Sequence, residues 1–261
     1  MIQWETSGRV GLATIDRQER RNALNAELCD DLRGYVQSSS GLRAVVITGA
    51  GKAFCAGADL VTRSGDAAGT SGHGGGDTFR PAFERVLEAL VEFPGPVIAA
   101  INGAALGAGL QLAVACDLRV AAPGAVFGIP AARLGVLLNA SNIQRLALLV
   151  GQGPAREILL TGRTLDLDEA RAVGLVNRVA GDAAAGALAW AGEIAALAPL
   201  TVAGHKRALN LVAEAQGLQV GPDANAIAEL RALEDRAFRS RDLREGLAAF
   251  AEKRPPEFEG R

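Results

Sequence analysis

Two short runs of small residues could do chemistry with their backbone alone. The first run is Cys55-Ala56-Gly57-Ala58, and the second is Gly107-Ala108-Gly109. An unpaired backbone N–H group can donate to an anionic oxygen, and a helix N-terminus adds the positive end of its dipole. Two loops that each offer one such N–H could hold one oxygen between them. This arrangement is an oxyanion hole, which stabilises the negative charge that a thioester or acyl carbonyl gains during reaction.

The residues that flank the two runs predict the elements that would position them. Residues 45–48 and 97–101 are short apolar segments followed by glycine-containing turns, which is typical of buried strands. From Gly107 onward, apolar residues surround a single polar one over about three turns, so we expect a nearly buried helix. Asp117 ends this helix, and residues 118–122 have the pattern of the next strand. Strand, helix and strand in this order indicate a wound α/β architecture.

A purely structural interpretation of the small residues is the alternative. Glycine and alanine also let a buried helix pack closely against a sheet, and one run alone would favour that interpretation. The second run favours a functional role instead, because it repeats the same order of strand, turn and small residues. Nucleotide binding is not indicated, since residues 49–52 lack the spacing and the Ser or Thr of a phosphate loop.

The two runs together resemble the paired signatures of the crotonase (enoyl-CoA hydratase/isomerase) superfamily. Supporting motifs from residues 20–25, Arg-Arg-Asn-Ala-Leu-Asn, to the C-terminal tail extend the resemblance over essentially the whole chain. The resemblance implies an α/β fold, a crotonase-like spiral of ββα units with a C-terminal α-helical trimerisation segment. Residues 1–198 would form the acyl-CoA-binding spiral core and residues 199–261 the helical oligomerisation segment. The two oxyanion-hole N–H groups would be those of Ala58 and Ala108, the second at a position where the family usually has glycine.

The resemblance also implies a ligand and an assembly. The ligand or substrate is a coenzyme A thioester, with no further cofactor, and it would be bound at Ala23, Ala56, Asp59, Leu60, Pro130 and Asn139. Members usually lend their C-terminal segment to a neighbouring subunit of a homotrimer or dimer of trimers. There Phe250 would pack near the ligand and Lys253 would meet CoA phosphate. The alternative for Lys253 is a solvated lysine at a helix end.

Two positions depart from the family's catalytic pattern. A hydratase positions a water between two carboxylates that serve as base and acid. The first family glutamate lies three residues beyond the second oxyanion donor, where this chain has Gln111, and the second follows a proline, where it has Ala131. An amide cannot accept a proton near neutral pH, and a methyl group cannot exchange one. This pairing resembles actinobacterial members thought to bind long-chain acyl-CoA without turnover.

Other polar residues could carry a different reaction. Asp59 is the nearest carboxylate in sequence, but a structural role is favoured by about three to one. Arg133 is a further candidate near Ala131, and Asp117 is interpreted as a helix-end or subunit-contact residue. Three residues replace a stretch that is usually rich in glycine and could point at the acyl group: Asn139, Ser141 and Asn142.

Three functions are consistent with these residues. The first is a binder of fatty acyl-CoA thioesters with little or no hydratase activity. The second is an active enoyl-CoA hydratase, isomerase or decarboxylase that uses non-standard acid and base residues. The third is a scaffold protein with a vestigial pocket, which intact CoA affinity would argue against.

The composition argues against several other classes of protein. The 261 residues are 49% hydrophobic and 21% charged, with a formal net charge of −2. Without an extended basic block, no nucleic-acid partner is expected. No apolar run of about 18 residues stands apart from turn signals, and the N-terminus lacks a signal-peptide pattern. We therefore expect no transmembrane segment and a cytoplasmic location.

The cysteines and histidines do not indicate a metal site. Cys29, Cys55 and Cys116 are widely spaced in helical or apolar contexts, so we expect buried free thiols. His73 and His205 lie in no metal-ligand spacing, and no metal is expected.

Local signals predict several further elements. Residues 2–6 and 10–15 read as a hairpin, and Asn25 is expected to cap a helix over residues 26–38. After Pro154 helical spacing dominates.

Two more segments carry local signals. Asp242 with Glu245 resembles a capping box at the start of the last helix. Residues 62–78 are rich in glycine, serine and threonine, which predicts a mobile loop. This loop is either a substrate-entry flap or a tolerated surface insertion.

Overall fold

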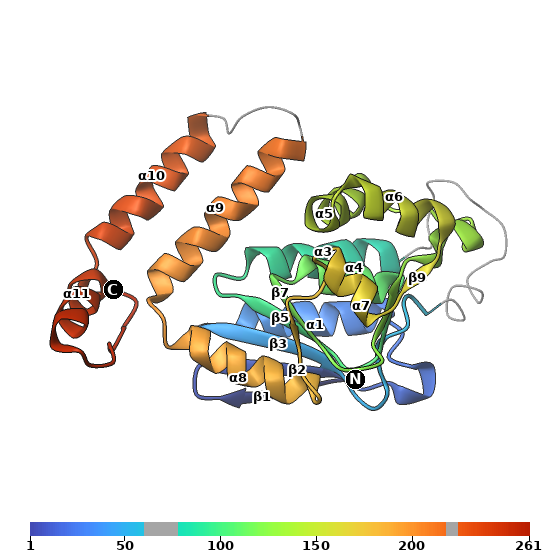
Figure 1. Cartoon of the computed structure of the whole chain (residues 1–261), viewed down its shortest axis with the longest axis horizontal. Helices are drawn as coiled ribbons and strands as arrows, with labels where there is room; N and C mark the ends of the chain where they lie inside the picture. Colours follow the sequence, from blue (N-terminus) through green and yellow to red (C-terminus); the bar gives the residue numbers. More distant parts are fainter. Residues whose placement is uncertain (60–77, 218–223) are drawn as a thin grey trace.

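The larger of the two sheets in the described part of the chain lies in the lower half of the view in Figure 1. The structure is a computed structural model that describes residues 1–59, 78–217 and 224–261. Six strands pair in the order β1-β2-β3-β5-β7-β10, and all neighbours are parallel except the β1–β2 hairpin. Their bounds are β1 Ile2–Ser7, β2 Val10–Ile15, β3 Ala44–Gly49, β5 Val97–Ile101, β7 Leu118–Ala121 and β10 Arg178–Val179. The predicted hairpin and the predicted buried strands are confirmed.

The smaller sheet explains why the two small-residue runs meet. It has the order β4-β6-β8-β9, with bounds β4 Ala53–Cys55, β6 Ala104–Leu106, β8 Val126–Gly128 and β9 Thr164–Leu165. Each of β4, β6 and β8 follows a strand of the larger sheet after a short turn, and helices come next. The chain therefore winds as a spiral of strand, strand and helix, as predicted. Because β4 and β6 are parallel neighbours, both runs leave the sheet at the same edge.

Helices cover both faces of the larger sheet (Figure 1). One face packs against α8, through the buried alanines Ala183, Ala187 and Ala191. The other face packs against α1, α3 and α4, so the strands are buried on both sides and read as continuous apolar runs. The bounds are α1 Ala26–Ser38, α3 Phe79–Glu92, α4 Ala108–Ala115, α5 Ala140–Val150, α6 Gln152–Thr161, α7 Leu167–Ala172 and α8 Ala183–Ala195. Two short 3₁₀ turns add η1 Gln18–Arg20 and η2 Pro130–Leu134.

Some local predictions are confirmed and others are corrected. The Asn25 side chain accepts from the Leu28 N–H at 2.9 Å and caps α1, as expected. Helix α4 has eight residues and is shorter than the three turns expected, because Cys116 already has extended backbone dihedrals. The three cysteines are buried free thiols, as predicted. His73 lies outside the described residues.

The predicted capping box at Asp242 and Glu245 is wrong. Helix α11 (Arg241–Glu252) is capped one residue before its start, where the Ser240 hydroxyl accepts from the Leu243 N–H at 3.1 Å. The Asp242 carboxylate accepts instead from the N–H groups of Glu259 and Gly260, both at 2.8 Å. A capping box is a local signal, and here a segment 17 residues away competes for its carboxylate.

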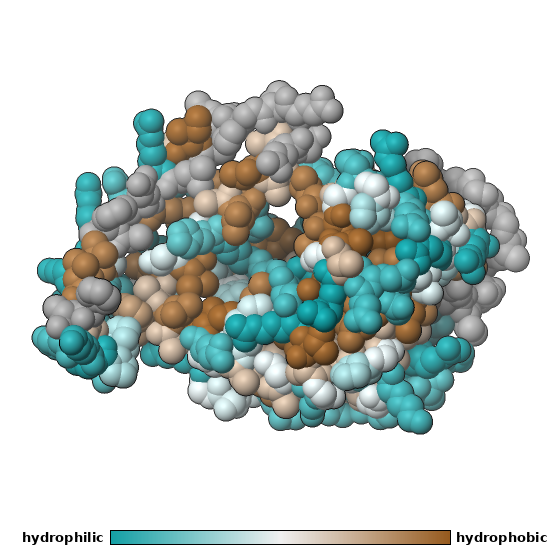
Figure 2. Space-filling view, viewed as in Figure 1, coloured by the Kyte–Doolittle hydropathy of each residue, from teal (hydrophilic) through white to brown (hydrophobic). Residues whose placement is uncertain are grey.

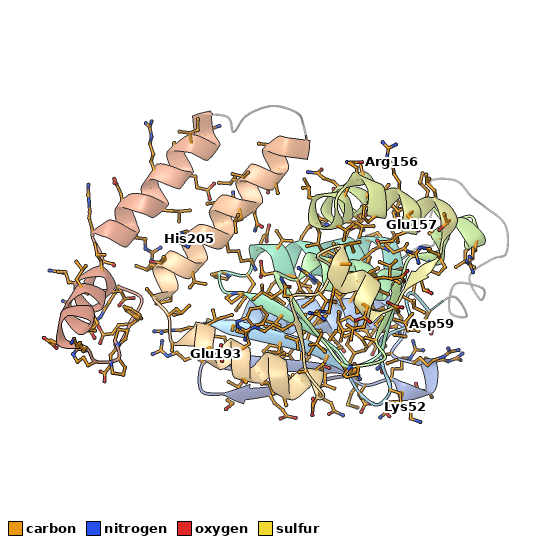
Figure 3. The ribbon with its side chains drawn as sticks, viewed as in Figure 1. Lys52, Asp59, Arg156, Glu157, Glu193 and His205 are labelled. Atoms are coloured by element: carbon orange, nitrogen blue, oxygen red, sulfur yellow. The ribbon has the colours of Figure 1, made fainter. Side chains whose placement is uncertain are left out.

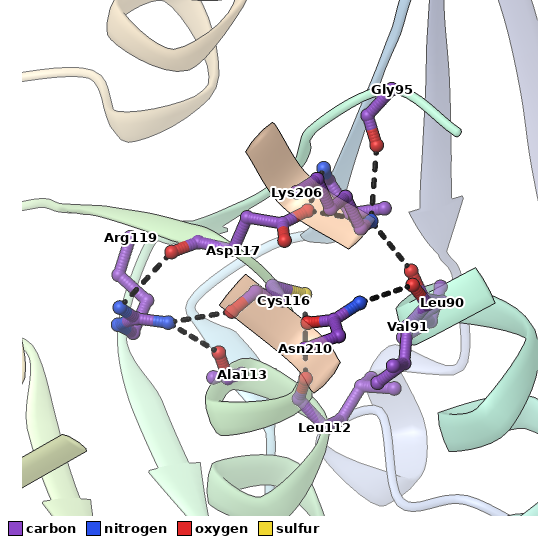
Figure 4. Close-up of polar contacts among 11 residues, drawn as sticks. Leu90, Val91, Gly95, Leu112, Ala113, Cys116, Asp117, Arg119, Lys206 and Asn210 are labelled. Carbon is purple, nitrogen blue, oxygen red and sulfur yellow. Dashed lines mark hydrogen bonds and ion pairs between the residues drawn. The ribbon is translucent and has the colours of Figure 1, made fainter. Parts of the chain in front are cut away.

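The C-terminal helices extend to one side of the sheets (Figure 1). Helix α9 (Pro199–Gly217) follows α8 and precedes α10 (Ala224–Phe238) and α11. Lys206 is buried and holds α9 to the core, donating to the carbonyl oxygens of Leu90 at 2.9 Å and Gly95 at 3.0 Å and pairing with Asp117 at 2.8 Å (Figure 4). Asp117 is thus a structural residue at the end of α4, as interpreted from the sequence.

No single helix of the described residues is long and apolar enough to cross a bilayer. Helix α8 and residues 199–215 of α9 meet the length and composition together, but they are bent by 111° to each other.

Candidate functional site

The first N–H donor lies just after β4. Leu24 and Ala58 form a parallel bridge, in which Leu24 N–H donates to the Gly57 carbonyl and Asp59 N–H donates to the Leu24 carbonyl, both at 2.8 Å. Successive N–H groups of an extended chain point to opposite sides, so the Ala58 N–H points away from Leu24. Since β6 lies on that other side of β4, the Ala58 N–H faces the loop that enters α4.

The second donor is the first N–H of α4. Gly107 precedes the helix with φ 54° and ψ −116°, a conformation that favours glycine, and its own N–H donates to the Gly128 carbonyl at 2.8 Å. Ala108 is the first helical residue, so its N–H has no intrahelical partner. Helical dihedrals suit alanine as well as glycine, and the departure at position 108 therefore keeps the donor.

Glycines let the two runs approach each other backbone to backbone. A Cβ atom at Gly109 would lie 2.2 Å from the Cys55 carbonyl oxygen, and one at Gly57 would lie 3.1 Å from the Leu106 carbonyl oxygen. Gly57 also has φ 113°, which side chains rarely adopt. The close contact places the N–H groups of Ala58 and Ala108 at one opening, which fits an oxyanion hole.

A cavity of about 210 Å³ opens beside these two N–H groups. Its walls come from the two runs, α3, α4, η2 and the start of α5. It brings together eight of the residues predicted from sequence: Ala56, Ala58, Ala108, Gln111, Pro130, Ala131, Asn139 and Asn142. Residues that are more than 80 positions apart in the sequence, such as Ala56 and Asn139, thus form one site.

The remaining predicted residues lie elsewhere or outside the described part. Ala23 is buried and Lys253 is exposed, and neither lines the cavity. Leu60 lies outside the described residues, as does the side chain of Phe250 in α11. The two further candidates Arg133 and Ser141 are exposed and do not line the cavity.

Asp59 supports the loop that carries the first donor. Its carboxylate is buried and pairs with Arg17 at 2.7 Å. Arg17 also donates to the Ala23 carbonyl at 3.2 Å, so the pair fixes the segment that bridges to Ala58. This contact is structural, as the sequence favoured.

Comparison with known proteins agrees with this geometry. The family model described as enoyl-CoA hydratase/isomerase matches residues 5–261. A probable enoyl-CoA hydratase echA6 of Mycobacterium leprae is 44% identical over 265 residues, covering 96% of both chains. A short-chain-enoyl-CoA hydratase of Clostridium acetobutylicum is 36% identical over 256 residues, covering 96% of this chain and 94% of its own.

A solved structure gives the same result. The crystal structure of an enoyl-CoA hydratase from Bacillus anthracis superposes with a TM-score of 0.84 at 33% identity, over 100% of this chain and 99% of that one. The chain belongs to the enoyl-CoA hydratase/isomerase family. The predicted fold class is thereby confirmed.

Gln111 and Ala131, the two positions where the resemblance led us to expect glutamates, both line the cavity. Ala131 contributes a methyl group to the cavity wall from η2. Gln111 contributes an amide from α4, and its Oε1 accepts from Asn142 Nδ2 at 2.8 Å. The Asn142 side chain is itself buried, and its Oδ1 accepts from Arg145 at 2.9 Å. Polar side chains from α4 and α5 therefore form one connected network on the cavity wall.

One carboxylate that lines the cavity was not predicted from the sequence. Glu84 of α3 lines the cavity, accepts from Asn139 Nδ2 at 2.9 Å and pairs with Arg80 at 3.4 Å. Nothing in the sequence around Glu84 distinguishes it from the other glutamates of α3. Asn139, in contrast, is a residue type that favours the N-cap position of a helix. In the structure it caps α5 by accepting from the Asn142 N–H at 2.9 Å.

The thiol of the first small-residue run is not a nucleophile. Burial raises the pKa of the Cys55 thiol to about 12, so this thiol is neutral at physiological pH. It accepts a hydrogen bond from the Gly57 N–H and stabilises the loop. His205 lies on α9, well separated from Asp59 beside the first run (Figure 3).

Proposed function

We propose that this protein binds fatty acyl-CoA thioesters and has little or no hydratase activity. The thioester oxygen would lie between the N–H groups of Ala58 and Ala108. The observation that carries the proposal is the pair Gln111 and Ala131, which face the same cavity as both donors. Such a protein would resemble the actinobacterial members that lack both catalytic glutamates.

The missing carboxylates account for the loss of hydration. Positioned acids and bases contribute about 10² to 10⁴-fold to such rates. Gln111 can hold a water by hydrogen bonds but cannot take its proton, and Ala131 can do neither. The oxyanion hole is unaffected by either substitution, so binding and polarisation of the thioester would be retained.

An apolar wall supports a fatty acyl chain as the bound group. Phe79 and Phe83 stack at 5.3 Å between ring centroids, and both line the cavity. Four more apolar residues complete the wall after Ala131: Leu134, Val136, Leu137 and Leu138. Leu137 is 85% exposed, and a bound chain that covers it would remove apolar surface from water.

Glu84 favours a second candidate function. This carboxylate lines the cavity and could transfer a proton to or from an enolate held at the oxyanion hole. The protein would then be an active hydratase, isomerase or decarboxylase with a non-standard acid or base. Such an enzyme should lose turnover when Glu84 is replaced by glutamine, whereas Glu92→Gln on the same helix should have no effect.

Titration and turnover measured together test the two candidates. Calorimetric titration with palmitoyl-CoA should give micromolar binding, and crotonyl-CoA and trans-2-hexadecenoyl-CoA should show no hydration above background. Clear hydration would favour the second candidate. Failure of every acyl-CoA to bind would contradict both and favour a scaffold with a vestigial pocket.

The contact between the two runs provides a sharper test of the oxyanion hole. Gly109→Ala should lower palmitoyl-CoA affinity at least about tenfold, because the new Cβ would force the Cys55 carbonyl and α4 apart. Gly192→Ala on α8 is the matched control, since a Cβ there meets nothing within 4 Å. Equal affinity of the two variants, both with native circular dichroism, would argue against thioester binding at this opening.

We also propose a homotrimer or a dimer of trimers. Helix α11 lies away from the cavity of its own chain (Figure 1), so Phe250 and Lys253 would act in a neighbouring subunit. Hydrophobic surface is visible over the C-terminal helices in Figure 2, and Leu209, Val212 and Leu247 are among the exposed apolar residues. Light scattering should give three or six times the 26.9 kDa chain mass, and a monomer would contradict the proposal. The expected cytoplasmic location stays a prediction.

A further inference from the structure

We propose that the cavity selects acyl-CoA thioesters with a hydrogen-bond-accepting oxygen on carbon 3, above all 3-oxoacyl-CoA. The inference rests on the proposed function and adds the class of acyl group. It follows from the hydrogen-bond network Arg145–Asn142–Gln111, which turns the donor end of the Gln111 amide toward the ligand.

Arg145 sets the orientation of Asn142. A guanidinium only donates hydrogen bonds, so the group of Asn142 that faces Arg145 must be its oxygen, at 2.9 Å. Burial lowers the pKa of Arg145, yet an arginine stays protonated at physiological pH, and Glu88 and Glu214 oppose the shift. With its oxygen held, Asn142 presents its NH₂ group to Gln111.

Asn142 in turn sets the orientation of Gln111. The Asn142 NH₂ group donates to Gln111 Oε1 at 2.8 Å, so the oxygen of Gln111 is occupied. Gln111 lines the cavity, and the group of its amide that is left for a ligand is Nε2, with two N–H bonds. The orientation depends on the fixed polarity of the guanidinium, and flipping either amide would place two donors or two acceptors face to face.

This N–H donor lies close to the oxyanion hole. Gln111 is three residues after Ala108 on α4, which places the two Cβ atoms about 5–6 Å apart on one face of the helix. In an acyl thioester, an oxygen on carbon 3 can lie up to about 5 Å from the thioester oxygen, given ordinary bond lengths. One ligand can therefore accept from the Ala108 N–H and from Gln111 at the same time.

The same donor discriminates among acyl groups. A saturated chain offers no acceptor, so binding it would strip water from the Gln111 NH₂ group without replacement. A 3-oxo group offers an acceptor only, which matches this donor. A 3-hydroxy group can accept as well, but its own hydrogen then needs another partner.

Asn142→Asp should reverse the polarity of the site. Aspartate would accept from Arg145 and from the Gln111 NH₂ group, so the Gln111 amide would turn and present its oxygen to the cavity. The wild-type protein should bind 3-oxohexadecanoyl-CoA about five- to tenfold more tightly than palmitoyl-CoA. The Asn142→Asp variant should lose this preference and bind 3-hydroxyhexadecanoyl-CoA more tightly than the 3-oxo ligand.

Two further variants complete the experiment. Gln111→Met fills similar space without a donor and should bind the saturated and 3-oxo ligands with equal affinity. Gln152→Glu adds a negative charge at an exposed position at the start of α6, outside the network, and should behave as the wild type.

The possible results separate this inference from the proposed function. Palmitoyl-CoA binding without any 3-oxo preference in the wild type would overturn the inference and leave the proposed function intact. The same preference in wild type and Gln111→Met would also overturn it, as would tighter binding of 2-hydroxyhexadecanoyl-CoA than of the 3-oxo ligand. No binding of any acyl-CoA would overturn both.

Discussion

Glutamate at both positions 111 and 131 should raise the hydration of crotonyl-CoA by about 10² to 10⁴-fold over the native protein. Both side chains already line the cavity beside the N–H groups of Ala58 and Ala108, so two carboxylates there could hold a water between them. Spectrophotometric loss of the enoyl absorbance measures the rate. The expected effect is large because the substitutions add proton transfer to the proposed oxyanion hole.

The single variants separate the two roles. Gln111→Glu alone should give a smaller gain than the pair, because the acid toward the substrate is still absent. Its carboxylate would accept from Asn142 Nδ2, as the Gln111 oxygen does at 2.8 Å, and would stay ionised beside Arg145. Ala131→Glu alone should show almost no gain. A folded double variant with no increase would mean that the cavity differs from a hydratase site by more than two side chains.

Those elements that depend on local signals could be predicted from sequence. Asn25 caps α1 where expected, and β5 covers the same residues as the predicted strand. The two small-residue runs were also recognised, since glycine marks backbone conformations and close contacts that side chains would prevent. Their meeting at one opening required the additional inference that β4 and β6 are neighbours.

The polar wall of the site could not be predicted in the same way. Glu84 is on α3, Gln111 on α4 and Arg145 on α5, and each pair is separated by more than two dozen residues. Their contacts depend on how three helices pack, which no local pattern encodes. Helix α5 itself was not predicted from sequence, because Ser141 and Asn142 in its first turn are residue types whose side chains also hydrogen-bond the backbone outside helices.

Arg119→Met should lower the free energy of unfolding by about 4 kcal/mol, the largest stability loss that we expect from one substitution. Arg119 is 2% exposed, and its guanidinium donates to carbonyl oxygens of Leu175 at 2.7 Å, Cys116 at 2.7 Å and Ala113 at 3.3 Å (Figure 4 shows the last two). Methionine fills similar volume but leaves these buried acceptors unpaired, and each unpaired acceptor costs about 1–3 kcal/mol.

Lysine should rescue this position only in part. An ammonium is compact and has three donors, whereas the planar guanidinium of Arg119 reaches acceptors on both α4 and the chain before β10. We therefore expect Arg119→Lys to lose about half as much stability as Arg119→Met. Urea unfolding at fixed protein concentration measures both, with exposed Arg156→Met on α6 as the control that should unfold as the wild type.

The same variant links stability to the site. Ala113 and Cys116 lie at the C-terminal end of α4, the helix that carries Ala108 and Gln111 at its other end. If Arg119 holds this helix in place, Arg119→Met should also weaken palmitoyl-CoA binding under conditions where it is still folded. A large loss of stability with unchanged affinity would mean that the contacts of α4 with β4 and β6 position Ala108 and Gln111 without help from its C-terminal end.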